Sequence, residues 1–318
     1  MEAIGSRSKP PNHVAFIFAD GDSVGSAIQA VVEKYGFNGY SRFSQALSEA
    51  ANQATAHTLA HVYQNHELRE HIDQDTGKSY LATPFDIITI GGDDVLLIST
   101  ADHALDIACG LSQEFQKRAN TLLQSQGMAL EKPLTLSVGV VIAHTGHPIV
   151  NLAQRAGELL KSAKRGRTKS NQSNQVQGWI DFHIVSTPGL EPLTEIRGKD
   201  YARPGQLSLT ARPYALSKMQ ELLNQARSLR RELPGSKRSQ LYHACFTAPD
   251  RVSATLAVLQ AQVRMSHPQR TALFKALHSL GAGVCYPFVQ SRTNRYTTSL
   301  PDLMELAAFI EVKQEAHP

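Results

Sequence analysis

The chain has 318 residues, of which 42% are hydrophobic, and a formal net charge of +4 at pH 7. This length and apolar fraction suffice for one large or two ordinary globular domains, and no apolar stretch approaches the roughly 20 residues of a transmembrane helix. The N-terminal segment lacks the apolar core of a signal peptide, and the three cysteines have no metal-ligand spacing. We therefore expect a cytoplasmic protein that does not bind membranes and has neither a disulfide nor a zinc site.

Runs of β-branched and apolar residues bounded by turn residues predict strands in the first two thirds of the chain. They cover residues 14–19, 85–90, 95–99, 134–143 and 178–185. Helical periodicity between them predicts helices over about 41–64, 101–124 and 149–164. The order β-α-β-β-α-β predicts an α+β fold: a ferredoxin-like palm domain with an antiparallel sheet, helices on one face, and the first and third strands side by side.

The rest of the chain is less informative. Residues 165–177 are polar without apolar periodicity and predict a surface loop, whereas helical spacing of apolar residues resumes at about residue 214. We expect an N-terminal tail at residues 1–12, a palm domain at 13–213 and a small helical domain at 214–318.

A turn with two glycines and two acids is the most informative motif. Gly91, Gly92, Asp93 and Asp94 lie between the apolar runs FDIITI and VLLIST, which predicts a tight β-hairpin that ends in adjacent carboxylates. The glycines provide positive φ angles and leave room for a nucleotide near the backbone, and the carboxylates are hard ligands suited to Mg²⁺. This arrangement is typical of a palm-type nucleotidyl transferase, although Gly-Asp turns also occur as plain hairpin turns.

A second acidic strand end lies upstream, in VAFIFADGDSVG. In the predicted sheet, Asp20 and Asp93 are neighbours, and two carboxylates so close together repel each other unless a cation lies between them. We expect Asp20 and Asp93 to hold Mg²⁺ or Mn²⁺, with Asp94 or Asp22 completing the ligand shell or binding a second ion. The alternative for Asp20 and Asp22 is a polar turn that caps the following helix.

Phosphate-binding groups are expected beside these acids. The backbone amides from Gly21 to Gly25, including that of Ser23, would surround phosphates at a helix N-terminus. Lys164, at the end of the helix predicted over residues 149–164, would neutralise the outer phosphates as a ribose hydroxyl attacks the α-phosphate. The alternative for this basic helix end is a solvated surface that complements the helix dipole.

The motifs FADGDSVG, IGGDDVLLIS, LSVGVVIAH and LAQRAGELLKSAK occur in this order. Together they resemble the second palm domain of the large subunit of type III CRISPR effector complexes, and more distantly the GGDEF diguanylate cyclases. The resemblance covers roughly residues 13–187 and implies that Asp20, Asp93 and Asp94 match the metal-binding acids of that family. It also implies a synthase that joins ATP into cyclic oligoadenylates, second messengers of antiviral defence. In the diguanylate cyclases a basic residue follows the AK pair. Arg167, which we expect to help bind the triphosphate, lies one residue off that spacing, so Lys164 is the better match.

The sequence also departs from this family. It shows one palm, no recognisable HD nuclease motif and no zinc-finger cysteines, so DNA cleavage is not expected. The resemblance leaves two arrangements open: a homodimer of palms, or a heterologous palm partner within a CRISPR RNA-protein complex. Two other functions remain open, a catalytically silent nucleotide-binding subunit and a cyclic-dinucleotide cyclase, although Asp94-Val95 replaces the Glu-Phe of the cyclase signature.

Overall fold

The computed structural model describes residues 1–72, 76–128, 130–170, 176–185, 189, 191–283, 286–290 and 294–310. The chain divides into two compact units. The first contains residues 1–188 and 213–216, and the second contains residues 189–212 and 217–318. Within the described residues, no helix combines the length and the apolar character needed to cross a membrane.

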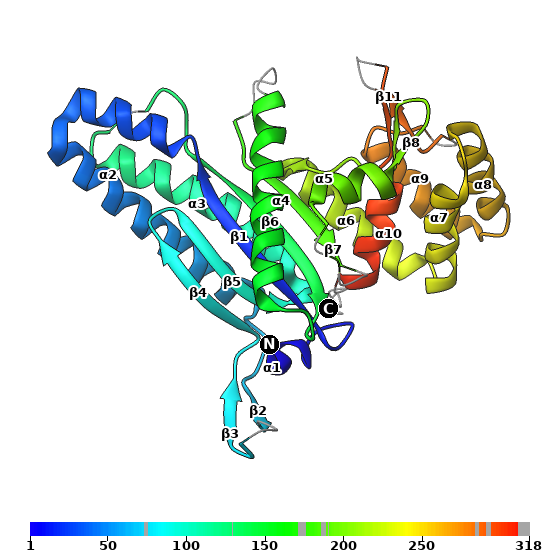
Figure 1. Cartoon of the computed structure of the whole chain (residues 1–318), viewed down its shortest axis with the longest axis horizontal. Helices are drawn as coiled ribbons and strands as arrows, with labels where there is room; N and C mark the ends of the chain where they lie inside the picture. The colour runs from blue at the N-terminus through cyan, green and yellow to red at the C-terminus, as the bar shows by residue number, and fades with distance from the viewer. Residues whose placement is uncertain are drawn as a thin grey trace. The chain divides into compact units, whose positions relative to one another are not determined.

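A six-stranded sheet with the order β10-β7-β6-β1-β5-β4 forms the centre of the first unit (Figure 1). Its strands are β1 (His13–Asp22), β4 (Phe85–Gly91), β5 (Asp94–Thr100), β6 (Thr135–His144), β7 (Trp179–Ile184) and β10 (Tyr214–Ala215). Strand β1 lies between β5 and β6 and runs antiparallel to both. The predicted pairing of the first and third strands is thus confirmed, and it brings the end of β1 beside the start of β5.

The α+β class is confirmed, but the sheet is mixed rather than antiparallel. Strand β6 pairs with β7 in parallel, with Val138 opposite Ile180. The two strands are connected by α4 (Ile149–Ser170), and a parallel pair needs such a crossover connection. Helix α4 also extends to Ser170, so the prediction of a loop from residue 165 was wrong for residues 165–170; residues 171–175 lie outside the described part.

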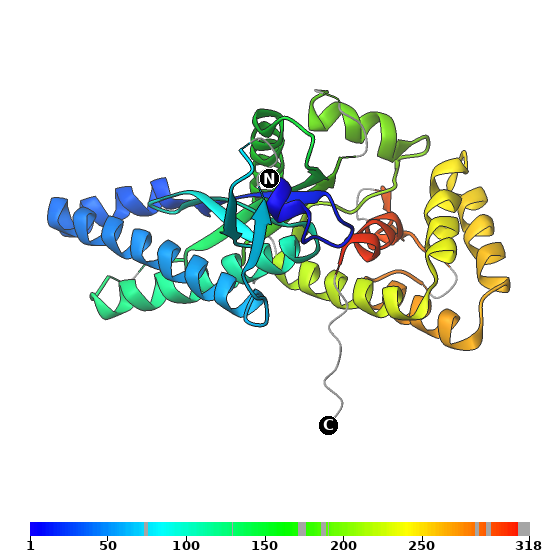
Figure 2. The same cartoon turned by 90° about the horizontal axis from the view of Figure 1, so that it is seen from below.

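The helices cover both faces of the sheet, not one face as predicted. Helices α2 (Val24–Val62) and α3 (Ala104–Ser125) pack against each other on one face, and α4 lies on the other, as Figure 2 shows from below. At Gly139 of β6 the backbone of α4 lies close to the strand. A Cβ added there would lie 2.3 Å from the carbonyl oxygen of Ala156 and 2.4 Å from the nitrogen of Leu160. The backbone of α4 therefore rests directly on the strand.

Several elements of the first unit differ from the predicted ones in extent or were not predicted. Helix α2 begins directly after β1, and Gly36, with φ +66°, interrupts its helical geometry. Short elements complete the unit: α1 (Glu2–Gly5), a hairpin of β2 (Arg69–Ile72) and β3 (Ser79–Ala82), and the 3-10 helix η1 (Ala101–His103).

The second unit is mainly helical, as predicted for the C-terminal region. Its longer helices are α6 (Leu216–Glu232), α7 (Gly235–Thr247), α8 (Arg251–Val263), α9 (His267–Ser279) and α10 (Leu300–Phe309). It also contains α5 (Leu193–Ile196), the π-helix η2 (Arg197–Tyr201), and a four-stranded sheet of β8 (Ala202–Arg203), β9 (Leu207–Ser208), β11 (Val289–Gln290) and β12 (Tyr296–Thr297). Cys109 and Cys245 are buried free thiols, whereas Cys285 lies outside the described residues.

Candidate nucleotide and metal site

The hairpin between β4 and β5 has the turn that the sequence predicts. Gly91 pairs with Asp94, so Gly92 and Asp93 are the two residues of the turn. Gly92 has φ +65°, a conformation that residues with a side chain rarely adopt. A positive φ at the first turn position is typical of tight hairpins whose twist matches that of the strands. The turn therefore holds the two carboxylates at the end of the sheet.

Strand β1 approaches this turn closely at Gly21. A Cβ added to Gly21 would lie 2.3 Å from Oδ2 of Asp93 and 2.6 Å from Cγ2 of Val24. A backbone hydrogen bond from Gly21 to Asp93 also favours the ionised carboxylate. The absence of a side chain at Gly21 thus allows the acid of the turn to lie directly against the backbone of β1.

Asp20, Asp93 and Asp94 form a group of interacting carboxyl groups. Burial raises the pKa of Asp94 to about 7, together with a hydrogen bond to Asp20 and repulsion from the charges of Asp20 and Asp93. The pKa of Asp93 is also raised, first by burial and then by the charge of Asp20. Near neutral pH, this group therefore retains a proton or recruits a cation.

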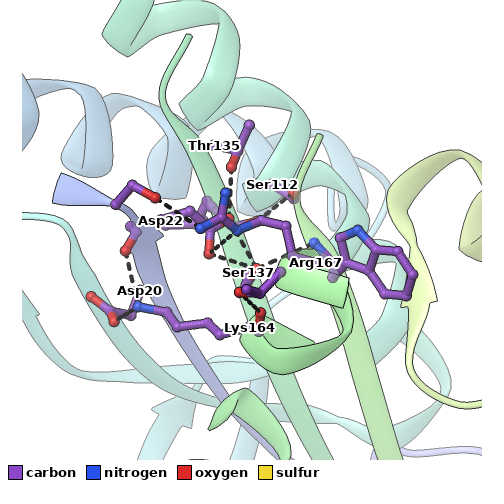
Figure 3. A network of polar contacts seen from close by, with 12 residues as sticks. Asp20, Asp22, Ser112, Thr135, Ser137, Lys164 and Arg167 are labelled. Atoms are coloured by element: carbon purple, nitrogen blue, oxygen red, sulfur yellow. Dashed lines mark hydrogen bonds and ion pairs between the residues drawn. The ribbon is translucent and has the colours of Figure 1, made fainter. Parts of the chain in front are cut away.

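Lys164 of α4 provides a cation beside the acids. Its ammonium group donates hydrogen bonds to the carboxylate of Asp20 and, over 2.9 Å, to the carbonyl oxygen of Gly21 (Figure 3). The side chain is 32% exposed, and its charge lowers the pKa values of Asp93 and Asp94. Lys164 therefore lies where the sequence places it, at the same edge of the sheet as the acids.

Asp22 makes a different set of contacts. Its side chain is almost completely buried, and it accepts hydrogen bonds from Thr135 over 2.7 Å and from Ser137 over 2.9 Å. Arg167 forms an ion pair with it, with Nε 3.3 Å from Oδ1. Burial raises the pKa of Asp22, whereas Thr135, Arg167 and Ser137 oppose that rise.

Ser23 and Gly25 lie at the turn from β1 into α2. Ser23 occupies the N-cap position with φ +61°, and its hydroxyl accepts a hydrogen bond from Nη2 of Arg167 over 2.8 Å instead of capping the helix. A Cβ added to Gly25 would meet no atom within 4 Å, so packing alone does not require a glycine there. The role of these amides in phosphate binding stays a prediction.

Thr135 and Ser137 are functional-site residues that were not predicted from the sequence. A signal for them was present, because they are polar residues two positions apart in the otherwise apolar strand β6 and so share one face of the sheet. Ser137 lies opposite Asp20 in the register of β1 and β6, and Thr135 lies opposite Asp22. That register, which joins segments far apart in the chain, is needed to recognise them as partners of Asp22.

The carboxylate oxygens of Asp20, Asp93 and Asp94 are suitable ligands for a divalent cation. Among the residues that the structure describes, no three His, Cys, Asp or Glu side chains converge tightly enough to form a metal site. The Lys164 ammonium lies against Asp20, and the pKa values of Asp93 and Asp94 are raised, in part by neighbouring negative charge. Hard oxygen donors that repel one another are stabilised by a hard cation, so Asp20, Asp93 and Asp94 are the residues that would hold Mg²⁺ or Mn²⁺.

Comparison with known proteins identifies relatives of this fold. The family model of the Cas10/Cmr2 second palm domain matches residues 13–173. The CRISPR system Cmr subunit Cmr2 of Pyrococcus furiosus is 28% identical over an alignment of 162 residues that covers 48% of this chain and 17% of that protein.

Two solved structures of the Csm1-Csm4 cassette have a similar fold. The Csm1-Csm4 cassette in complex with one ATP has a TM-score of 0.54 at 14% identity, over 98% of this chain and 38% of that chain. The same cassette in complex with cA4 has a TM-score of 0.51 at 14% identity, over 88% of this chain and 38% of that chain. The diguanylate cyclase SiaD, in complex with its activator SiaC from Pseudomonas aeruginosa, matches 52% of this chain and 51% of its own at 16% identity, with a TM-score of only 0.30.

The chain thus spans much less than half the length of Cmr2 and of the matched Csm1-Csm4 chains. The family match begins at the first residue of β1 and extends just beyond α4, so it contains the acids, the two-glycine turn and Lys164. Because this match covers half of the chain, the protein belongs to the family of the Cas10/Cmr2 second palm domain.

Proposed function

We propose that this protein is a Mg²⁺- or Mn²⁺-dependent nucleotidyl transferase that joins ATP into cyclic oligoadenylates for CRISPR-type antiviral defence inside the cell. The observation that carries the proposal is the electrostatic interaction of Asp20, Asp93 and Asp94 at one edge of the sheet, where Lys164 contacts Asp20. A palm with only a structural role has no physical need for three mutually repelling acids at that edge.

Each of these residues has a role in the proposed reaction. Asp20, Asp93 and Asp94 would hold a divalent cation, which supplies charge stabilisation at the α-phosphate and lowers the pKa of the attacking hydroxyl. Lys164 would bind the outer phosphates and hold the leaving group in line. As the ribose oxygen bonds to the α-phosphorus, its proton passes to solvent, and the bond from that phosphorus to the leaving pyrophosphate breaks.

The choice of ATP rests on the relatives. The Csm1-Csm4 cassette has been solved with one ATP and with cA4, and this chain shares its fold. By the same likeness, we propose that the protein works within a CRISPR RNA-protein complex or as a pair of palms. A single palm positions one triphosphate, and bond formation needs a second nucleotide whose hydroxyl is in line. The second palm would come from an identical copy or from another chain.

The test is incubation of the purified full chain with ATP, GTP, CTP or UTP and either Mg²⁺ or Mn²⁺, with the products identified by mass spectrometry. Cyclic oligoadenylate formed by the wild type and not by Asp93→Asn would support the proposal. A cyclic guanine dinucleotide would favour the cyclase alternative instead. If the protein binds ATP but forms no product, either alone or together with any protein that co-purifies with it, the catalytically silent nucleotide-binding subunit is favoured. A strictly monomeric yet active protein would contradict the pairing of palms.

A further inference from the structure

Three side chains link the end of β1 to helix α4: Asp22, Arg167 and Ser23, called here the Arg167 tether. Nε of Arg167 lies 3.3 Å from Oδ1 of Asp22, and Nη2 donates to the hydroxyl of Ser23 over 2.8 Å. A single guanidinium thus binds residues on both sides of the point where β1 ends and α2 begins. Figure 3 shows the guanidinium of Arg167 lying beside Asp22 at the end of β1.

The Asp22 end of the tether is fixed. The Asp22 side chain is 1% exposed, and Thr135 and Ser137 on the neighbouring strand donate hydrogen bonds to its two oxygens. A buried carboxylate with these partners has one orientation and is stabilised by a cation beside it. Oxygens already engaged with Thr135, Ser137 and Arg167 have little capacity left for a metal ion. The contacts of Asp22 are therefore those of an anchor for Arg167.

The Ser23 end of the tether is a strained turn. Its φ of +61° is unfavourable for a residue with a side chain and persists only where surrounding contacts hold it. Its N-cap position leaves the amides at the start of α2 without a side-chain cap from Ser23. The hydrogen bond from Arg167 is a contact that holds the hydroxyl of Ser23 away from these amides.

We propose that Asp22 and Arg167 are positioning residues, which hold Ser23 so that the turn from β1 into α2 presents its amides to a nucleoside triphosphate. This proposal rests on the proposed function, because it takes a triphosphate as the ligand of that turn. Two other roles are possible for these residues: Asp22 could be a metal ligand, and Arg167 could bind the phosphates directly through its charge. The three roles predict different effects on metal binding and on nucleotide binding.

The first experiment separates metal affinity from nucleotide affinity in Asp22→Asn. Mn²⁺ binding to the full chain is measured by electron paramagnetic resonance without nucleotide, and ATP binding is measured by calorimetry at saturating Mn²⁺. We expect the Kd for ATP to rise about tenfold, as for the loss of one charge-assisted contact, and the Kd for Mn²⁺ to stay within about twofold. A Kd for Mn²⁺ that rises about tenfold would overturn the proposal and make Asp22 a metal ligand. The matched control is Asp86→Asn, which makes the same change at an exposed acid on β4.

The second experiment tests the geometry of Arg167. Arg167→Lys keeps the charge but loses the planar fork that binds two partners, so we expect it to weaken ATP binding nearly as much as Arg167→Gln. Wild-type affinity in Arg167→Lys would overturn the proposal. Arg165→Gln, on the exposed side of the same helix, is the control. The double variant Asp22→Asn/Arg167→Gln should bind ATP no more weakly than either single variant, and additive losses would contradict a shared tether.

A third variant addresses folding. Ser23→Gly leaves the buried pair of Asp22 and Arg167 intact and tolerates the positive φ, so it should fold like the wild type while binding ATP severalfold more weakly. Unchanged ATP affinity in this variant would refute the link through Ser23. A lower melting temperature of Asp22→Asn with unchanged ATP affinity would reduce the tether to a structural role. If the wild type binds ATP without forming product, the proposed function is refuted, but the ATP affinities of the variants still test the tether. If the wild type binds no ATP, both the proposed function and the tether proposal are overturned.

Discussion

The ammonium of Lys164 joins α4 to β1, because it donates hydrogen bonds both to the carboxylate of Asp20 and to the carbonyl oxygen of Gly21. A divalent cation held by Asp20 would compete with Lys164 for the same carboxylate. On binding of that cation, the ammonium would lose an ionic partner and become available to the phosphates of a nucleotide. The ion pair would then couple metal binding to the availability of a phosphate ligand.

Lys164→Ala should raise the KM for ATP about tenfold or more, since a hydrogen bond to a charged group contributes about 1.5–3 kcal/mol. The same variant should need less Mn²⁺ for half-maximal activity, because the carboxylate of Asp20 no longer has a competing cation. Steady-state kinetics at varied ATP and Mn²⁺ measure both effects. Lys161→Ala, an exposed lysine one helical turn earlier, is the control and should behave like the wild type. Unchanged KM for Lys164→Ala would remove this residue from the site.

The double variant Asp93→Asn/Asp94→Asn should lose product formation without losing the fold. Both acids lie at a hairpin turn and repel Asp20, so their neutral replacements remove repulsion in the free protein. We expect the melting temperature without metal to be equal to or higher than that of the wild type, and Mn²⁺ to raise it no further. Thermal unfolding with and without Mn²⁺, together with a product assay, checks this. Asp86→Asn is the matched control, and full activity of the double variant would refute the site.

The stability of the metal-free protein should fall as the pH rises toward neutrality. The folded state raises the pKa of Asp94 to about 7 and raises that of Asp93, so both carboxyl groups are neutral more often in the folded than in the unfolded chain. Their contribution to stability is therefore complete below the ordinary pKa of an aspartate, near 4, and is lost as the pH rises through about 7.

Melting temperatures of the wild type and of Asp94→Asn, measured from pH 4.5 to pH 8.5 without metal, test this dependence. The variant should be the more stable protein at pH 8, and its advantage should shrink as the pH falls below about 7. The affinity of the wild type for Mn²⁺ should rise over the same interval, because the cation binds the ionised carboxylates. Parallel curves for the two proteins would contradict the raised pKa of Asp94.

Gly139→Ala should destabilise the first unit and weaken nucleotide binding. The added methyl group would meet backbone atoms of Ala156 and Leu160, which cannot rotate away, so α4 must shift and carry Lys164 and Arg167 with it. Overpacking of this kind costs about 1–3 kcal/mol. Gly157→Ala is the control within α4, because a methyl group there meets no atom within 4 Å and alanine favours a helix by about 1 kcal/mol. Equal unfolding free energies for Gly139→Ala and the wild type would show that the close contact is absent.

The sequence predicted the five longer strands of the six-stranded sheet and the position of the principal acids, because both depend on local patterns. The apolar strand that ends at Asp20 and the two-glycine turn before Asp94 are each recognisable within a dozen residues. The position of Lys164 was predicted from the apolar periodicity of one helix. These features are set by strand alternation, turn chemistry and helix period, which act over short distances.

The contacts of Asp22 could not be predicted in the same way, since its partners Thr135, Ser137 and Arg167 depend on sheet register and on the face that α4 covers. The polar composition after residue 164 favoured a loop, yet α4 continues to Ser170, and its Arg167 contacts Asp22 and Ser23. The two-residue strands of the second unit are too short to show any alternation. The contacts of Asp22 therefore depend on the pairing of segments far apart in the chain, which local sequence patterns do not show.

Arg212→Met should strongly destabilise the second unit. Nη2 of Arg212 lies 2.9 Å from Oδ1 of Asp302 and 3.1 Å from Oε2 of Glu305, and both acids are largely buried. Burial raises the pKa of Glu305 and the charge of Arg212 opposes that rise, so removal of the cation leaves two carboxyl groups without it. The loss of one member of a buried ionic group costs about 3–5 kcal/mol.

Urea unfolding of the full chain measures this loss, with Arg264→Met, an exposed arginine after α8, as the control. The triple variant Arg212→Met/Asp302→Asn/Glu305→Gln should recover part of the stability, because it removes the cation and both anionic groups together. A loss below about 1 kcal/mol in Arg212→Met, in the range of exposed ion pairs, would mean that the acids find other partners. Tyr201 and Tyr242, which donate hydrogen bonds to Glu305 over 2.9 and 3.1 Å, are the groups that could supply such compensation. Their replacement by phenylalanine in the Arg212→Met background would then lower the stability further.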